Sequence, residues 1–341
     1  MTMILFYSDP HLGLTPQANT TPASRQLWQD SIYAAVNQLP FHQYPTSFCL
    51  GDFFDKYHNY ELDLVKSARP FKYTSYILSG NHDIQNKMNT YSSLYFLNHI
   101  YKEDKAIFAP FNESFIRTII INKTAFYAIP YLHSQKLFIE ALEKVEKQRL
   151  EGDRNLLLLH CNYDLSEEIR NETTLNLSKE WAERLKKKFD YVLMGHIHEA
   201  WQQDNLICIG NTFPTSFNDI NQKRFLLYNT ETNEFSSVPL RSPKYLEVDA
   251  NHLDILEDNS VHYELIKVIG DIKISDVARI VKEIKKIWEK HEDMLGIKLD
   301  FNIEGVNDNV EVKSIEDLPT IVNNELKNTE LYPLWKSLLG A

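Results

Sequence analysis

The sequence predicts an α/β fold, because short apolar runs alternate along the chain with helical stretches. Each run is apolar throughout and ends in glycine or a polar residue, as strands buried on both faces of a sheet do. Five of these runs are followed by aspartate, asparagine or histidine. The predicted helices between them cover residues 24–39, 61–68, 134–150 and 178–189.

The polar residues at the five strand ends follow a regular order. They are Asp9 and His11 after residues 4–7, Asp52 after 48–50, Asn81, His82 and Asp83 after 76–78, His160 after 156–159, and His196 and His198 after 191–194. Ligands of α/β proteins collect where strands end. Any one of these polar residues could be a turn residue or a core histidine whose ring nitrogens are hydrogen-bonded. Neither explanation accounts for polar residues at all five strand ends. Together they predict one functional site.

Length and composition place the chain among ordinary globular proteins. Its 341 residues are 43% hydrophobic, which is enough for one large domain and a smaller one. No apolar stretch approaches the roughly 20 residues that span a bilayer, so we expect neither a membrane span nor export. Cys49, Cys161 and Cys208 form no C-x-x-C pair, which predicts reduced thiols in a reducing compartment such as the cytoplasm.

The net charge argues against unaided binding of nucleic acid. The chain carries 36 basic and 47 acidic residues, a formal charge of −11. Phosphate contacts are normally supplied by Lys and Arg. A nucleic-acid function therefore needs positive charge from another source, such as bound metal ions or a partner protein.

The character of the sequence changes after residue 240. Two strand-like stretches, 245–248 and 263–269, precede a helix whose apolar positions recur every three or four residues, and 298–303 is a possible third strand. We therefore predict a main domain over residues 1–240 and a small α/β domain over 241–305. Residues 306–341 form an apolar terminal segment that either docks on a partner helix or packs on its own domain.

The residues at the strand ends suit a metal site. Imidazole, carboxylate and amide oxygen without thiolate favour manganese, iron or zinc. Seven candidate ligands exceed one tetrahedral shell, so two ions are expected, with Asp52 as their bridge. Two ions suit displacement at phosphorus, because they generate hydroxide near neutral pH and neutralise phosphate oxygens. His82 is expected to give a proton to the leaving group, oriented by Asp83.

The ordered motifs resemble those of the calcineurin-like metallophosphoesterases. They are D-x-H at Asp9 and His11, G-D-x-x-D over 51–55, G-N-H-D over 80–83, the lone His160 and G-H-x-H over 195–198, and they lie within residues 1–235. The resemblance implies a four-layer β-sandwich flanked by helices, in place of a plain parallel sheet. It assigns Asp9, His11, Asp52 and His198 to one ion. The other ion takes Asp52, Asn81, His160 and His196.

Within this family the chain resembles the SbcD-type nuclease subunits and their phage counterparts. The features are H-L-G after the first motif, GDFFD, IGNTFPTSF, and no arginine soon after Asp52. The resemblance implies a manganese-dependent 3′-to-5′ exonuclease and single-strand endonuclease. It also implies that residues 241–305 are a capping domain that serves as a DNA-binding accessory, and that DNA is the substrate. A homodimer is expected to work beside an SbcC-type coiled-coil ATPase. The chain has no nucleotide-binding G-x-x-x-x-G-K-[ST] motif, in agreement with such a partner.

Two other functions remain open from the sequence. The first is a free-standing phosphodiesterase that acts on small nucleotides or other diesters. The second is a metal-binding dimer scaffold for the ATPase with little catalysis, which the presence of every expected ligand and of His82 disfavours. Helices over 61–68 and 91–100 are candidates for the dimer contact, and the sequence identifies no DNA-binding residue.

Overall fold

The structure is a computed structural model that describes residues 2–16, 21–84, 92–108, 116–150, 153–166, 175–257, 263–273, 276–291, 294–303 and 327. Apart from Lys327, the predicted terminal segment 306–341 lies outside this part. The chain forms two compact units. The first contains Met1–Leu14, Ser31–Thr215 and Asn221–Ser242, and the second contains Thr15–Asp30, Ser216–Ile220 and the described part of Pro243–Ala341.

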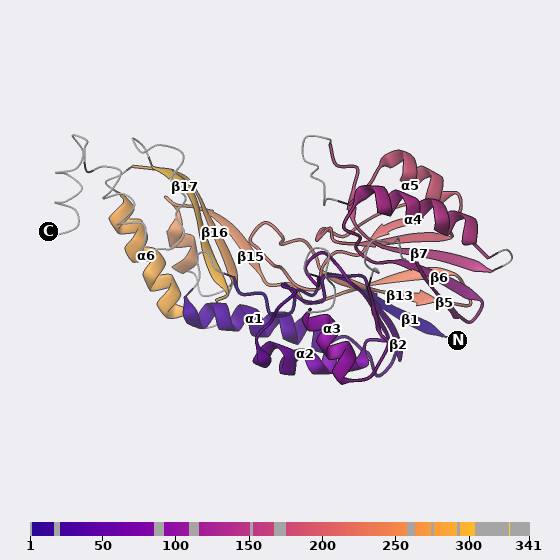
Figure 1. Ribbon diagram of the computed structural model, residues 1–341. Coiled ribbons are helices and arrows are strands. Elements are labelled where there is room, and N and C mark those ends of the chain that lie inside the picture. Colours follow the sequence, from indigo (N-terminus) through magenta and orange to yellow (C-terminus); the bar gives the residue numbers. More distant parts are fainter. Residues whose placement is uncertain are drawn as a thin grey trace. The chain divides into compact units, whose positions relative to one another are not determined.

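Two six-stranded sheets form the first unit (Figure 1). The first sheet has the strand order β14-β13-β1-β2-β3-β4. Its strands are β1 (Met3–Tyr7), β2 (Thr46–Cys49), β3 (Tyr76–Leu78), β4 (Ala106–Ile107), β13 (Arg224–Asn229) and β14 (Glu234–Pro239). The second sheet has the strand order β11-β12-β10-β7-β6-β5. Its strands are β5 (Arg117–Ile121), β6 (Thr124–Ile129), β7 (Arg154–His160), β10 (Tyr191–Gly195), β11 (Trp201–Gln203) and β12 (Leu206–Cys208). A separate pair joins β8 (Asn162–Tyr163) to β9 (Asn176–Leu177). In the first sheet β1 to β4 are parallel, and antiparallel pairing occurs only on the side of β13 and β14. In the second sheet parallel strands lie in the middle and antiparallel strands at both edges.

The core of the sandwich lies between the two sheets. Alternate residues of each central strand point into it, because side chains of a strand alternate between its faces. The Phe6 and Phe48 rings of the first sheet stack at 5.0 Å, and Phe126 of the second packs against Phe48 at 5.1 Å. Leu156, Leu158 and Leu193 complete the same buried cluster. This packing explains why these strands are apolar throughout and not alternating.

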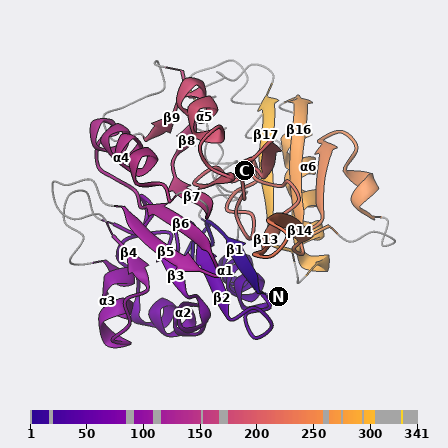
Figure 2. The ribbon, with the colours of Figure 1, turned by 90° about the vertical axis from the view of Figure 1, so that its right-hand side faces the viewer.

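Helices cover the outer faces of the sandwich. α4 (Gln135–Gln148) and α5 (Lys179–Lys186) pack on the second sheet through a separate apolar cluster (Figure 2). The other helices wholly within the first unit are α2 (Glu61–Tyr73) and α3 (Ser93–Ile100), while α1 (Pro22–Asn37) is divided between the two units. On the outer face of the first sheet the Tyr7 hydroxyl hydrogen-bonds Thr74, just after α2, at 2.7 Å. The predicted helix–sheet–sheet–helix architecture is therefore confirmed.

One predicted helix boundary is wrong. The sequence predicts that the second helix ends at residue 68, just before Pro70, whereas α2 continues to Tyr73. Proline lacks an N–H and normally breaks a helix interior. Here Pro70 and Phe71 are buried, and the Pro70 carbonyl accepts the backbone N–H of Thr74 at 3.0 Å. Burial of the last turn thus outweighs the missing hydrogen bond.

The second unit contains a small three-stranded parallel sheet with a helix on it. Its elements are β15 (Tyr245–Asp249), η3 (Leu253–Glu257), β16 (Leu265–Ile272), α6 (Val277–Lys290) and β17 (Gly296–Ile303). Val277, Ile280, Ile284 and Ile287 of α6 are buried with Val248, Val268 and Leu299 of the strands. The strand-helix-strand pattern predicted after residue 240 therefore forms, with slightly longer strands. The role of this unit as a cap stays a prediction.

Two general expectations can be compared with the described residues. Among them, no helix combines the length and apolar character needed to cross a bilayer. Cys49, Cys161 and Cys208 are buried thiols in no disulfide, as the sequence predicts.

Candidate metal centre

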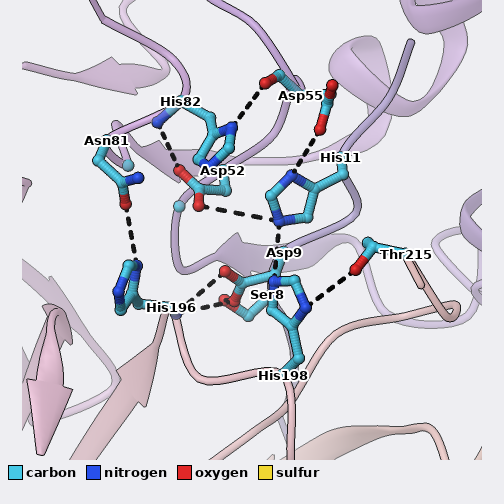
Figure 3. A network of polar contacts seen from close by, with 12 residues as sticks. Ser8, Asp9, His11, Asp52, Asp55, Asn81, His82, His196, His198 and Thr215 are labelled. Carbon is cyan, nitrogen blue, oxygen red and sulfur yellow. Dashed lines mark hydrogen bonds and ion pairs between the residues drawn. The ribbon is translucent and has the colours of Figure 1, made fainter. Parts of the chain in front are cut away.

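The seven predicted ligands come together at the carboxyl ends of five strands. Neighbouring strands β1, β2 and β3 present Asp9, His11, Asp52 and Asn81 from one sheet, and β7 and β10 present His160, His196 and His198 from the other. Figure 3 shows the side chains converging from both sheets on one region. All but Asn81, His196 and His198 are buried. The closure of the sandwich therefore assembles a site from residues up to 189 positions apart.

Several ligand-bearing residues have strained backbones. Asp9, His11, Asp52 and His196 have φ values of 50°, 46°, 47° and 83°. Residues other than glycine rarely adopt this left-handed region, and such strain concentrates at functional sites. Backbone hydrogen bonds hold the loops, since Asp9 N donates to Gly51 O and His11 N to Asp52 O, both at 3.1 Å. The first two loops thus fix each other.

Two glycines let the loops approach closely enough. A Cβ atom on Gly51, which has φ of 109°, would overlap the His160 imidazole at Nδ1. A Cβ atom on Gly80 would overlap the Asp52 carboxylate. The glycines of the G-D and G-N-H motifs are therefore required by the space that the ligand side chains occupy.

One ligand group gathers around Asn81. Its Oδ1 atom lies 3.1 Å from His160 Nε2 and 2.9 Å from His196 Nδ1, and His160 Nε2 lies 3.4 Å from Asp52 Oδ2. These four side chains match the second predicted ligand set. Two imidazole nitrogens, an amide oxygen and a carboxylate oxygen facing one point form a donor set that suits a divalent metal ion.

The second ligand group gathers around His11. The Nε2 atoms of His11 and His198 are 3.0 Å apart, and His11 Nε2 lies 3.8 Å from Asp52 Oδ2. Asp9 belongs to the same cluster, and both its oxygens accept the backbone N–H of His196 at 3.0 Å. Asp52 Oδ2 thus lies between the two groups. This is the position that a bridging ligand needs.

Further contacts orient the histidines, and the sequence predicts none of them. Thr215 Oγ1 lies 3.0 Å from His198 Nδ1, and Asp55 Oδ1 lies 3.4 Å from His11 Nδ1. His160 Nδ1 donates to the Leu50 carbonyl at 2.8 Å. Each contact holds one ring nitrogen and directs the other into the site. Asp55 and Thr215 lie in the GDFFD and IGNTFPTSF stretches, which were the signals available in the sequence.

His82 lies beside the ligand groups and is exposed to solvent. Its Nδ1 atom hydrogen-bonds the Asp55 carbonyl at 2.6 Å, and its ring meets the His11 ring edge to face at 4.9 Å between centroids. Its backbone N–H donates to Asp52 Oδ1 at 2.9 Å. His82 is thus held next to the site without being part of either ligand group.

The Asp83 carboxylate contacts backbone groups of the ligand loops. Its buried carboxylate accepts the backbone N–H groups of Gly80 at 2.8 Å, Phe54 at 2.9 Å and Phe53 at 3.1 Å. The His82 ring hydrogen-bonds the Asp55 carbonyl. Asp83 therefore ties two ligand loops together, and its role in orienting His82 stays a prediction.

The profile of the calcineurin-like phosphoesterase family matches residues 2–200, which include all seven ligands. The chain belongs to this family. It is therefore a phosphoester hydrolase, and divalent metal ions are implied for its site. The two convergent donor sets fit such ions.

The individual proteins that this phosphoesterase resembles share only low sequence identity with it. It is 24% identical over 290 residues to the SbcD subunit of the nuclease SbcCD from Staphylococcus epidermidis, covering 74% of this chain and 72% of that protein. Identity to the SbcD subunit from Staphylococcus saprophyticus is 22% over 279 residues, covering 73% and 71%. A solved structure titled as a novel archaeal phosphodiesterase covers 70% of the chain and all of its own, with 16% identity and a TM-score of 0.34.

Electrostatics of the phosphoesterase site favour a charged Asp52. Burial alone raises the pKa of its carboxyl, but the nearby His160 and His11 imidazoles hold that pKa well below its usual value. Burial disfavours the charged form of His160, but the Asp52 carboxylate outweighs it and raises the pKa of His160 to about 9. For His196, burial and the charge of His160 lower the pKa to about 4. Without metal ions, a protonated His160 thus supplies the positive charge beside Asp52.

Proposed function

We propose that this chain is the nuclease subunit of an SbcCD-like complex and cleaves phosphodiester bonds of DNA with two metal ions. The main observation that supports this proposal is that Asp52 Oδ2 lies between two convergent ligand groups, 3.4 Å from His160 Nε2 and 3.8 Å from His11 Nε2. The names of the two similar staphylococcal proteins, subunits of a nuclease, support a nucleic acid as the substrate, and DNA is the one we propose. The activities are those of a 3′-to-5′ exonuclease and a single-strand endonuclease.

Manganese is the metal we propose, on the resemblance to SbcD-type nucleases, and the nitrogen and oxygen ligands without a thiolate suit it as they suit iron or zinc. One ion is held by Asp9, His11, Asp52 and His198. The other is held by Asp52, Asn81, His160 and His196. When bound, two such ions lower the pKa of water and neutralise charge on the phosphate.

The residues of the chain divide the remaining work. Asp52 sets the separation of the ligand groups, and the strained loops hold them before substrate arrives. His82 is exposed and held at Nδ1 by the Asp55 carbonyl, which leaves its Nε2 as the atom that gives a proton to the departing oxygen. An imidazole suits this step because it carries a proton at physiological pH.

The test measures cleavage of end-labelled duplex DNA and of bis-p-nitrophenyl phosphate with Mn²⁺, Mg²⁺ or EDTA. We expect His82→Ala to keep its metal and lose cleavage by roughly 10²–10⁴-fold, as removal of a general acid does. Asp52→Ala should lose both metal and activity. His42→Ala, which removes an exposed histidine outside the site, is the matched control. Diester hydrolysis with DNA untouched would instead identify a free-standing phosphodiesterase, and full activity in His82→Ala would remove its role as proton donor.

A homodimer through α2 and α3 is part of the proposal. Of the ten exposed large apolar side chains in the described part of the chain, eight lie between Tyr57 and Tyr101, on or beside these helices. Tyr60 is 84% exposed and Val65 71%. Such a cluster marks an interaction surface. Val65→Asp should halve the mass in sedimentation, whereas Ile120→Asp, on β5 and 61% exposed, should leave it unchanged.

An SbcC-type ATPase is the proposed partner, and the cytoplasm is the proposed location. Residues 306–341, which lie outside the described part except for Lys327, are the candidate docking segment. Their apolar residues recur with polar ones between them, as in helices that bind grooves. Removal of this segment should abolish co-purification with the ATPase while cleavage of bis-p-nitrophenyl phosphate persists. Unchanged co-purification would exclude the segment.

A further inference from the structure

A groove in the second unit lies between η3 and α6, and none of its lining residues is a ligand of the metal centre. It has a volume of about 450 Å³, which is within the range of ligand-binding pockets. Leu253, Leu256 and Ile287 line the groove and are buried, so they give it an apolar floor. A groove with such a floor favours the binding of a peptide segment that carries apolar side chains.

The α6 wall of the groove is positively charged. Arg279, Lys286 and Lys290 lie on it, and all three are exposed. Arg279 pairs with Glu283 at 3.2 Å, and Asp254 supplies one further carboxylate, so positive charge remains in excess. Within the described residues Lys286 and Lys290 have no ion pair. Their charges are therefore available to the carboxylates of a segment that enters the groove.

The sequence that follows β17 contains a segment with the matching chemistry. Residues 314–326, S-I-E-D-L-P-T-I-V-N-N-E-L, lie outside the described part of the structure. They contain three acidic residues and no basic one, and five apolar side chains lie among these: Ile315, Leu318, Ile321, Val322 and Leu326. The later apolar stretch, 331–338, has Lys336 and no acidic residue. Charge complementarity therefore selects 314–326, and not 331–338, for the groove.

The topology of the second unit brings this segment to the groove. Ile303, the last residue of β17, pairs with Ile272 at the end of β16, and α6 begins shortly after, at Val277. The chain thus leaves β17 near the end of α6 that carries Arg279. Twelve residues separate Ile303 from Ile315, and a flexible linker of this length spans about 17–21 Å. The eleven residues from Arg279 to Lys290 cover about 16 Å of helix, so the segment can reach the whole groove.

We propose that residues 314–326 dock in this groove of their own chain. Their apolar side chains cover the floor, and their carboxylates lie against Lys286 and Lys290. Because the segment is tethered, its local concentration is in the millimolar range, and weak contacts are sufficient. The inference goes beyond the proposed nuclease function and does not rest on it. It leaves residues 331–341 as the part of the terminal segment that is free to bind the ATPase.

The experiment measures how fast thermolysin, which cuts before large apolar residues, cleaves within residues 314–326 of the full chain. Mass spectrometry identifies the cleavage sites, and thermal melting checks the fold. Lys286→Glu with Lys290→Glu reverses the charge of the groove. Lys282→Glu with Lys285→Glu is the matched control, because these exposed lysines lie on α6 outside the groove. A rescue variant adds Glu316→Lys and Asp317→Lys to the groove variant.

The segment should be cut about tenfold faster in the groove variant than in the wild type, because two exposed ion pairs become repulsions. The control variant and the rescue variant should be cut like the wild type. Equal rates in the groove variant and the wild type, equal acceleration in the groove and control variants, or failure of the rescue would overturn the inference. Protection that disappears on dilution would place the segment in the groove of a second copy and also overturn it. Cleavage of DNA by the wild type is measured separately, so none of these results bears on the nuclease function.

Discussion

Replacement of Thr215 by valine tests whether the contact behind His198 determines metal affinity. Thr215 Oγ1 lies 3.0 Å from His198 Nδ1, and His198 Nε2 faces the His11 ligand group. With the Nδ1 proton donated to Thr215, the Nε2 lone pair is directed toward the metal. Valine has the shape of threonine but offers no hydrogen-bond acceptor, so the ring loses its orientation and the backbone keeps its packing.

The expected size of the effect follows from one lost hydrogen bond. A net contribution of about 0.5–1.5 kcal/mol corresponds to roughly 2- to 13-fold in affinity. Contacts of this kind behind metal ligands are worth about 10- to 100-fold. We therefore expect Thr215→Val to weaken one of the two Mn²⁺ sites by about tenfold, and the other site to be unchanged.

Calorimetric titration of the metal-free protein with Mn²⁺ measures both sites. Thr215→Ser keeps the hydroxyl and is the matched control, so it should retain most of the affinity. The reasoning is refuted if Thr215→Val binds both ions like the wild type. It is also refuted if the serine variant is as weak as the valine variant, because the hydroxyl would then not be the cause.

Three further predictions concern the loops and the charge of the site. Asp83→Ala should lower the free energy of unfolding by about 3 kcal/mol in urea, since it leaves three buried N–H groups without an acceptor, and a loss below about 1 kcal/mol would contradict its structural role. Gly80→Ala should abolish Mn²⁺ binding in the same titration, because its Cβ would overlap the Asp52 carboxylate, and intact binding would show that the loop adjusts. Removal of metal should lower the melting temperature more at pH 9 than at pH 6. The pKa of His160 is raised to about 9 from the ordinary value of 6.5. The positive charge of His160 therefore stabilises the fold beside Asp52 below pH 6.5, and this stabilisation is lost as the pH rises through 9. Equal shifts of the melting temperature at both pH values would contradict the pairing of His160 with Asp52.

Local features of the sequence determine the strands of this protein, its metal-ligand residues and its family. Continuous apolar runs predict strands with no exposed face, and the runs over 4–7 and 156–159 are buried in β1 and β7. The polar residues that end these runs predict the ligands, because the end of a strand fixes where the next side chains point. The order of the motifs was sufficient to predict the family, which the match over residues 2–200 shows.

Only the tertiary structure decided which groups act on one another. Asp83 and His82 are adjacent in sequence, yet the Asp83 carboxylate turns to the backbone of Phe53 and Phe54, and His82 contacts Asp55. The contact of Thr215 with His198 spans 17 residues. Such contacts depend on how loops cross after the sheets have packed. Residue spacing therefore predicts which side chains reach the site, and the packed loops determine their hydrogen-bond partners.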